Sequence, residues 1–117
     1  MALIYHIADS SDWEKAQDEG VYSTENLSRF GFIHCSTRDQ IIKVANFQYE
    51  GEEGKLLLEI DEDLLNSRVE YEKVPGAPFD EAFPHVYGPI EWEAVVNTAS
   101  FEPNLDGTFE FPDELEG

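Results

Sequence analysis

The chain of 117 residues is poor in cysteine and in long apolar runs. Its single cysteine, Cys35, excludes an intramolecular disulfide, and no C-x-x-C pair is available for metal or redox chemistry. No apolar run approaches the roughly 20 residues that a membrane-spanning helix needs. The N-terminal stretch MALIYHIADSSDWE has no basic region and too short an apolar run for a secretion signal. We therefore expect a cytoplasmic protein.

Basic residues are also scarce, because seven Lys and Arg face 26 Asp and Glu, which gives a net charge of −19. Nucleic acids and anionic membranes are bound largely through basic side chains. The sequence therefore predicts neither a nucleic acid nor a membrane as partner. Such an acid surplus is typical of a well-solvated surface. It also leaves open an acidic interaction domain that captures basic proteins.

Hydrophobic and aromatic residues are present in the amounts that a folded domain needs. They make up 41% and 13% of the chain, and the aromatic residues are spread along its whole length. A chain of this size can build one hydrophobic core without stapling by disulfides or metals. We predict a single domain over residues 1–112, followed by an acidic tail over residues 113–117.

Apolar runs and alternating patterns predict that much of the chain is strand. The predicted strands lie at residues 2–7, 32–35, 55–61, 69–74, 85–90 and 92–101, with a final hairpin arm at 106–111. The segment PGAPFDEAFP, residues 75–84, contains three prolines and is predicted as a loop.

Two segments carry start and stop signals of helices. The first follows Asp9 and ends at Gly20, and the second begins at Ser36 or Thr37. A single helical turn is predicted near residues 23–24. Strands and helices are mixed along the chain, and the later half is mostly strand. This order predicts an α+β fold with two or three helices on a largely antiparallel sheet.

All three histidines, His6, His34 and His85, lie in strand-like segments beside aromatic residues. Side chains alternate between the two faces of a strand, so His34 shares a face with Phe32 and Ser36. Three such positions together indicate a common site. Three unrelated, half-buried histidines are the alternative.

Spacing and adjacency argue against two other uses of these residues. The histidines match no compact metal motif, and Cys35 and His34 point to opposite faces of one strand, so we predict no metal site. The same geometry argues against His34 as the base for a Cys35 nucleophile. His6 or His85 could serve instead, but a small buried residue is the favoured role for Cys35.

Polar groups beside the histidines could hold a ligand. Ser36 and Gln40 lie at a helix start, where backbone N–H groups can bind an anion or a carboxamide. The alternative is that Ser36 or Thr37 only caps the helix. His85 and Tyr87 share a strand face and could grip a planar ring or a ribose hydroxyl. The alternative there is a proline-bounded turn with Tyr87 in the core.

Several blocks together resemble a small bacterial family, domain-of-unknown-function family 952. They are IYHI, W-E-x-A, GFIHCS with a glutamine four residues after its serine, VAN, LLLEID and PHVYGPI. The resemblance covers roughly residues 3 to 112. It implies an ADP-ribosyltransferase-like fold with a split sheet, which in other members of that superfamily binds NAD in a cleft.

The resemblance also implies roles for individual residues. His6 ends the first strand and is similar to the histidine that holds the ribose and carboxamide of NAD. Ile33 or His34 lies near the position of a stacking tyrosine. Glu91 or Glu93 lies near the position of the late catalytic glutamate, although neither is a clear match.

We therefore expect a histidine-lined cleft that binds NAD or a related nucleotide-like small molecule. His6 and His85 are the candidate catalytic residues. The candidate ligand-binding residues are His34, Ser36, Gln40 and Tyr87. An enzyme with such a site would carry out glycosyl or ADP-ribosyl transfer or phosphoester chemistry. A non-catalytic small-molecule-binding module and an acidic protein-interaction domain are the alternatives.

Overall fold

The computed structural model describes residues 2–115. Within this range the chain forms three α-helices and eight strands; they alternate as far as α3, and the five remaining strands follow without a further α-helix. The helices are α1 (Ser10–Glu19), α2 (Glu25–Phe30) and α3 (Ile41–Gln48). The strands are β1 (Leu3–Asp9), β2 (Val21–Tyr22), β3 (Ile33–His34), β4 (Lys55–Asp61), β5 (Arg68–Lys73), β6 (Ala82–Tyr87), β7 (Ile90–Glu91) and β8 (Val95–Phe101). The α+β prediction is confirmed.

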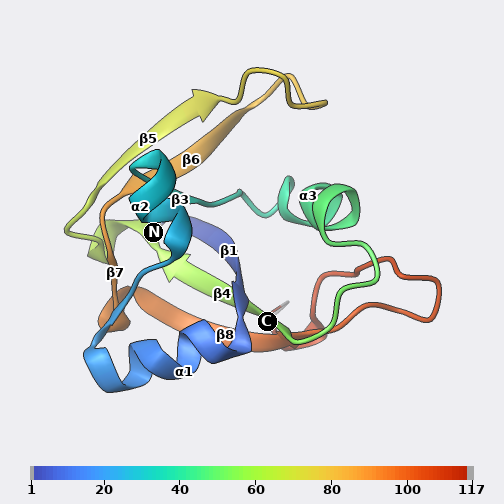
Figure 1. The fold of residues 1–117 in the computed structure, drawn as a ribbon, viewed down its shortest axis with the longest axis horizontal. Coiled ribbons are helices and arrows are strands. Elements are labelled where there is room, and N and C mark those ends of the chain that lie inside the picture. The colour runs from blue at the N-terminus through green and yellow to red at the C-terminus, as the bar shows by residue number, and fades with distance from the viewer. Residues whose placement is uncertain (1, 116–117) are drawn as a thin grey trace.

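The strands form two three-stranded sheets and one short pair, all antiparallel. Their orders are β1-β4-β8, β3-β6-β5 and β2-β7. The two larger sheets meet where Tyr5 and Ser36 exchange backbone hydrogen bonds of 2.7 and 2.8 Å. The arrangement is therefore a split, antiparallel sheet, and the β5–β6 hairpin extends away from β1-β4-β8 (Figure 1).

One face of the β1-β4-β8 sheet packs against α1. Alternate residues of β1, Ile4 and Ala8, are buried there with Trp13 and Ala16 of the helix. Because side chains alternate between the two faces of a strand, the spacing of Ile4 and Ala8 in the sequence puts both on the same face of β1. Gly20 ends α1 with a φ of 82°, a left-handed conformation that glycine adopts without steric cost.

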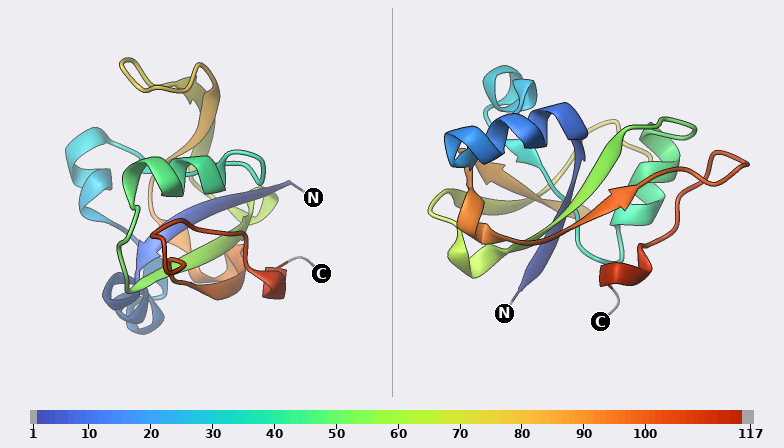
Figure 2. Two further views of the ribbon diagram at one scale, coloured as in Figure 1. Left: turned by 90° about the vertical axis from the view of Figure 1, so that its right-hand side faces the viewer. Right: turned by 90° about the horizontal axis from the view of Figure 1, so that it is seen from below.

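The opposite face of the same sheet packs against α3 and the C-terminal segment. Tyr5 of β1 and Leu57 of β4 are buried there with Ile41 and Ala45 of α3. Leu115, in the segment predicted as an acidic tail, also packs against this cluster. The sheet thus lies between α1 and α3, as the two views of Figure 2 show.

Helix α3 begins at Ile41, later than the predicted start at Ser36 or Thr37. The residues before it are held extended because Ser36 bridges to β1. A turn at residues 38–40 then leads into the helix. The side-chain oxygen of Gln40 accepts a hydrogen bond of 3.0 Å from the backbone N–H of Thr37, which is one of the two hydrogen bonds of a capping box.

Strand β6 begins at Ala82, inside the segment predicted as a loop. Pro84 lies in the middle of this strand, and its carbonyl accepts a 3.0 Å hydrogen bond from the N–H of Cys35. Proline has no N–H that could donate a second hydrogen bond back to Cys35, so the ladder between β6 and β3 ends at this point. This accounts for the short span of β3, which contains only Ile33 and His34.

The prediction of a hairpin arm at residues 106–111 is wrong, because no strand forms there in the described part of the chain. Instead, the N–H of Asn104 donates to the carbonyl of Thr108 across a turn. The N–H of Phe109 donates to the side chain of Asn46 on α3, at 2.7 Å. The side chain of Asn46 thus accepts the backbone hydrogen bond that a neighbouring strand would accept in the predicted hairpin.

Candidate functional site

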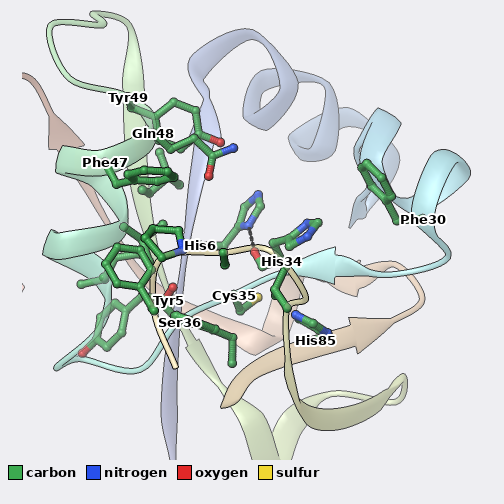
Figure 3. Close-up of a pocket in the computed structure, with 18 residues that line it drawn as sticks. Tyr5, His6, Phe30, His34, Cys35, Ser36, Phe47, Gln48, Tyr49 and His85 are labelled. Atoms are coloured by element: carbon green, nitrogen blue, oxygen red, sulfur yellow. Dashed lines mark hydrogen bonds between the residues drawn. The ribbon is translucent and has the colours of Figure 1, made fainter. Parts of the chain in front are cut away.

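A cavity of about 400 Å³ lies between α3, the β3–β6 pair and the loop that connects β5 to β6. Figure 3 shows Phe47, Gln48 and Tyr49 on one side of it and Phe30, from α2, on the other. His6, His34 and His85 lie between these walls. The three histidines, from separate parts of the sequence, therefore line the same cavity.

The loop between β5 and β6 closes the cavity over α3. Its Phe79 contacts Phe47 edge-to-face, with ring centroids 5.6 Å apart. Glu81, at the end of the loop, forms an ion pair with Lys43 of α3. The loop thus lies above α3 in Figure 1 and in the left view of Figure 2.

The cavity has an uncharged lining. None of the 18 described residues that line it is Asp, Glu, Lys or Arg. Most of the walls are aromatic or aliphatic, including Phe47, Phe79 and Phe83. The three histidines and Ser36 are among its few polar side chains. Apolar walls with a few placed polar groups are the usual construction of small-molecule sites.

His34 and His85 are direct cross-strand partners on β3 and β6. Their ring centroids are 5.4 Å apart. Phe32 stacks on His85 with a centroid distance of 4.0 Å and an interplanar angle of 14°. Burial, together with the neighbouring His85, lowers the pKa of His34 below its ordinary value. His34 therefore favours its neutral form.

Glu72, which does not line the cavity, contacts His85 through its carboxylate. Nδ1 of His85 is 2.9 Å from Oε1 of Glu72, and the hydroxyl of Tyr87 donates to the same oxygen. The hydrogen bonds from Tyr87 and from His85 lower the pKa of the Glu72 carboxyl. The carboxylate in turn raises the pKa of Tyr87. Glu72 therefore remains ionised at neutral pH and accepts both hydrogen bonds.

The other ring nitrogen of His85 has no partner. Nε2 is buried, and among the described residues no other buried side-chain nitrogen or oxygen lacks a hydrogen bond. The side chain of His85 is only 4% exposed. Buried polar atoms in native proteins are nearly always paired. Nε2 of His85 is therefore an exception among the described residues, and it is closed to water-sized molecules in the cavity as well as to bulk solvent.

His6 has the opposite environment, because both of its ring nitrogens are occupied. Nδ1 donates to the carbonyl of His34 at 2.5 Å, and Nε2 lies 2.8 Å from the hydroxyl of Tyr22. Burial raises the pKa of Tyr22, so its hydroxyl keeps the proton and donates it to His6. Burial also lowers the pKa of His6 to about 4. His6 is thus held neutral and connects β1, β3 and β2.

The structure brings four of the six predicted site residues to the cavity: His6, His34, Ser36 and His85. Gln40 and Tyr87 do not line it. The amide of Gln40 instead donates to the carbonyl of Ala82 at 2.9 Å, which ties the start of α3 to β6. Tyr87 is held by Glu72 and lies under the guanidinium of Arg68.

Neither candidate for the late glutamate lines the cavity. Glu91 accepts a hydrogen bond of 3.2 Å from the backbone N–H of Asn66, and Glu93 is exposed in the turn that follows β7. The carboxylate that does act on a site histidine is Glu72, which sequence reasoning missed. The alternating pattern of VEYEKV put Glu72 on a strand but gave no register against His85.

Cys35 is buried in the core on the α1 side of the structure. Burial raises the pKa of its thiol, so the reactive thiolate is disfavoured at neutral pH. This environment matches the favoured role of Cys35 as a small buried residue. Within residues 2–115, no group of three or more His, Cys, Asp and Glu side chains is arranged to hold a metal ion.

Fold and cavity together define a small α+β protein with a split antiparallel sheet and a neutral, histidine-bearing cavity. The chain belongs to the DUF952 family, whose model, described as a protein of unknown function, matches residues 7–98. This confirms the family that the sequence blocks indicated. None of the curated proteins matches the chain significantly.

Solved structures of one bacterial protein are similar to this chain. The crystal structure of protein CC0527 from Caulobacter crescentus, a structural genomics target, has a TM-score of 0.82 at 28% identity. The alignment covers 97% of this chain and 98% of that one. The solution NMR structure of CC0527 gives a TM-score of 0.81, also at 28% identity, and covers 98% of this chain and 97% of that one. The fold is therefore shared over nearly the whole length.

Among the described residues, none of the helices has the length and apolar character required to cross a membrane. The longest, α1, has ten residues.

Proposed function

We propose that this protein is a small-molecule-binding module whose cavity takes the uncharged, planar part of a nucleotide-like ligand. The observation that carries the proposal is the lining itself, which combines aromatic walls with histidine side chains and, among its described residues, has no Asp, Glu, Lys or Arg. Planar rings bind well between aromatic walls, and imidazole nitrogens supply directional hydrogen bonds at the ring edge.

The volume of the cavity limits what can enter. At about 400 Å³ it lies near the lower end of the range of roughly 300–1,000 Å³ that is usual for ligand pockets. A nucleobase or a nicotinamide ring with its ribose fits this scale, and a whole dinucleotide would extend beyond the mouth. Phosphates would also find no cation among the lining residues. We therefore expect uncharged compounds to bind better than their phosphorylated forms.

We assign the fold to the ADP-ribosyltransferase-like superfamily as part of this proposal. The split antiparallel sheet supports the assignment, as does the position of His6 on the first strand beside the cavity. Transfer of an ADP-ribosyl group requires a carboxylate near the ribose to stabilise the developing cation. None of the described residues that line the cavity is Asp or Glu. We therefore favour binding without turnover, with NAD as one candidate ligand.

The proposal is tested by NMR titration of labelled protein with nicotinamide, adenosine, NAD and ADP-ribose. We expect amide shifts within residues 4–8, 31–36 and 44–49 and around Phe83 and His85, with the uncharged compounds binding more tightly than ADP-ribose. Prolonged incubation with NAD should release no nicotinamide. An absence of shifts for all four compounds at millimolar concentration would refute the proposal.

Two exposed apolar residues supply a matched pair of variants. Phe47 lines the cavity and is 64% exposed, whereas Leu64 is 50% exposed and does not line it. F47A removes one aromatic wall, so it should weaken nicotinamide binding by about tenfold, the factor expected for losing one stacking contact. L64A should bind like the wild type. Equal binding by both variants would contradict the assignment of this wall.

A further inference from the structure

We propose that His34 is the specificity-determining residue of the cavity, the one of the three histidines whose ring nitrogens hydrogen-bond the ligand. The assignment rests on the proposed function and narrows its ligand class to planar rings that carry an uncharged carboxamide or cyclic amide at one edge. It separates His34 from His6 and His85, which the sequence marked as the catalytic candidates.

The first step of the argument concerns the two histidines that are closed to a ligand. Both ring nitrogens of His6 have partners, since Nδ1 is 2.5 Å from the carbonyl oxygen of His34 and Nε2 is 2.8 Å from the hydroxyl of Tyr22. Nδ1 of His85 is 2.9 Å from Glu72, and its Nε2 is closed even to water-sized molecules. Neither ring therefore presents a free nitrogen to the cavity.

The second step concerns the ring nitrogens of His34, neither of which has a hydrogen-bond partner among the described residues. In that part of the chain, Nε2 of His85 is the single buried side-chain nitrogen or oxygen without a partner. The unpaired nitrogens of His34 must therefore keep accessible surface. Because His34 is half-buried and lines the cavity, a ligand in the cavity can contact its ring (Figure 3).

The third step concerns the aromatic side chains that hold this ring without using its nitrogens. The ring centroid of Phe32 lies 4.7 Å from that of His34, and Phe30 meets His34 edge-on at 5.6 Å and 84°. Phe30 is 52% exposed and lies on the opposite side of the cavity from Phe47 (Figure 3). A planar ligand that enters between Phe30 and Phe47 therefore meets His34.

The fourth step concerns the chemistry of the ligand edge. A neutral imidazole carries one hydrogen-bond donor and one acceptor. Burial and the neighbouring His85 lower the pKa of His34, so a carboxylate or phosphate on the ligand would gain no ion pair from this ring at neutral pH. A carboxamide or cyclic amide is uncharged and has both a donor and an acceptor, so it can pair with either nitrogen of His34.

The test compares nicotinamide with 3-methylpyridine, which has the same ring with a methyl group in place of the carboxamide. Both affinities are measured for the wild type and for H34F, which keeps an aromatic ring beside Phe30 and Phe32 but removes both nitrogens. H34F should weaken nicotinamide binding by about tenfold, the factor expected for one buried hydrogen bond. Binding of 3-methylpyridine should be nearly unchanged.

H85F is the matched control, because it makes the same substitution at the cross-strand partner of His34. It should change the affinities for the two probes by the same factor. Long-range ¹H–¹⁵N spectra of the wild type give a second readout that needs no variant. Nicotinamide should shift the ring nitrogens of His34 more than those of His6 and His85, and 3-methylpyridine should not.

The outcomes distinguish this inference from the proposed function. Equal weakening of both probes by H34F, or unshifted ring nitrogens of His34 when nicotinamide binds, would overturn the inference and leave the binding module in place. A selective loss of nicotinamide binding in H85F instead of H34F would also overturn it. Failure of both probes to bind the wild type would overturn the proposed function and the inference with it.

Discussion

His6 and His85 show how far the surroundings of one residue type can differ within a single site. Both are buried and both line the cavity. His6 has two hydrogen-bond partners and is held neutral, so its role is to connect strands beside the cavity. His85 has one hydrogen-bond partner, Glu72, and its other ring nitrogen is buried without one.

The buried, neutral state of His6 predicts a pH dependence of stability. Its pKa is about 4 in the folded protein and 6.5 in the unfolded chain, so the unfolded chain binds more protons between these values. The contribution is complete above pH 6.5 and is lost as the pH falls toward 4. It corresponds to about 3 kcal/mol of unfolding free energy.

Urea unfolding of the wild type and H6Q from pH 7 to pH 4 measures this effect. The variant cannot titrate at position 6, so the difference in free energy between the two proteins should shrink as the pH falls. All other groups contribute equally to both proteins and cancel. A difference that stays constant over this range would show that His6 does not titrate as described.

At the scale of elements, the loop and the strand around the cavity are held by a few side-chain bridges. Gln40 is 6% exposed, and its amide joins the turn before α3 to the start of β6. Lys43 and Glu81 form a second bridge a turn further along, but their side chains are 41% and 36% exposed, so water screens this ion pair and it contributes little. The position of α3 against the cavity therefore depends chiefly on Gln40.

We expect Q40L to destabilise the protein by about 1–3 kcal/mol, because it leaves the N–H of Thr37 and the carbonyl of Ala82 without their partner. Urea unfolding monitored by circular dichroism measures the loss. Q17L is the control, since Gln17 is an exposed residue on α1. Equal stabilities of Q40L and Q17L would show that the bridge is not structural.

At the scale of the whole molecule, the net charge of −19 is carried almost entirely by the surface. Among the described acidic residues, only Glu59 and Asp61 are buried. Glu59 accepts hydrogen bonds from the hydroxyl of Tyr5 at 2.7 Å and from Asn97 at 2.8 Å. The remaining carboxylates repel one another across a compact body with a radius of gyration of 13.4 Å.

This repulsion predicts that salt stabilises the protein. The screening length falls from about 30 Å at 0.01 M salt to about 8 Å at 0.15 M, which is shorter than the molecule. The free energy of unfolding should rise by on the order of 1 kcal/mol over this interval, because self-repulsion of the folded state is reduced. Sodium, potassium and choline chlorides should act equally. A rise with one cation alone would indicate specific binding instead.

Local patterns in the sequence determined the elements and the faces of the strands. The run KLLLEID became β4 with the predicted bounds, and Gly20 ends α1 where it was predicted to. Alternation placed Cys35 on the core side and His34 beside Phe32. These features depend on residues a few positions apart, which is the range over which strand and helix geometry acts.

Tertiary structure decided what each site residue contacts. Glu72 reaches His85 only because β5 pairs with β6 in one particular register, and the proline-rich loop between these strands does not fix that register. Pro84 limits β3 to two residues because it has no N–H to donate to that strand. The backbone bridge between Ser36 and Tyr5 keeps Ser36 extended, so α3 begins only at Ile41. The pairing of distant segments is chosen by the packing of the whole chain, so no local pattern could reveal that one nitrogen of His85 would be left without a partner.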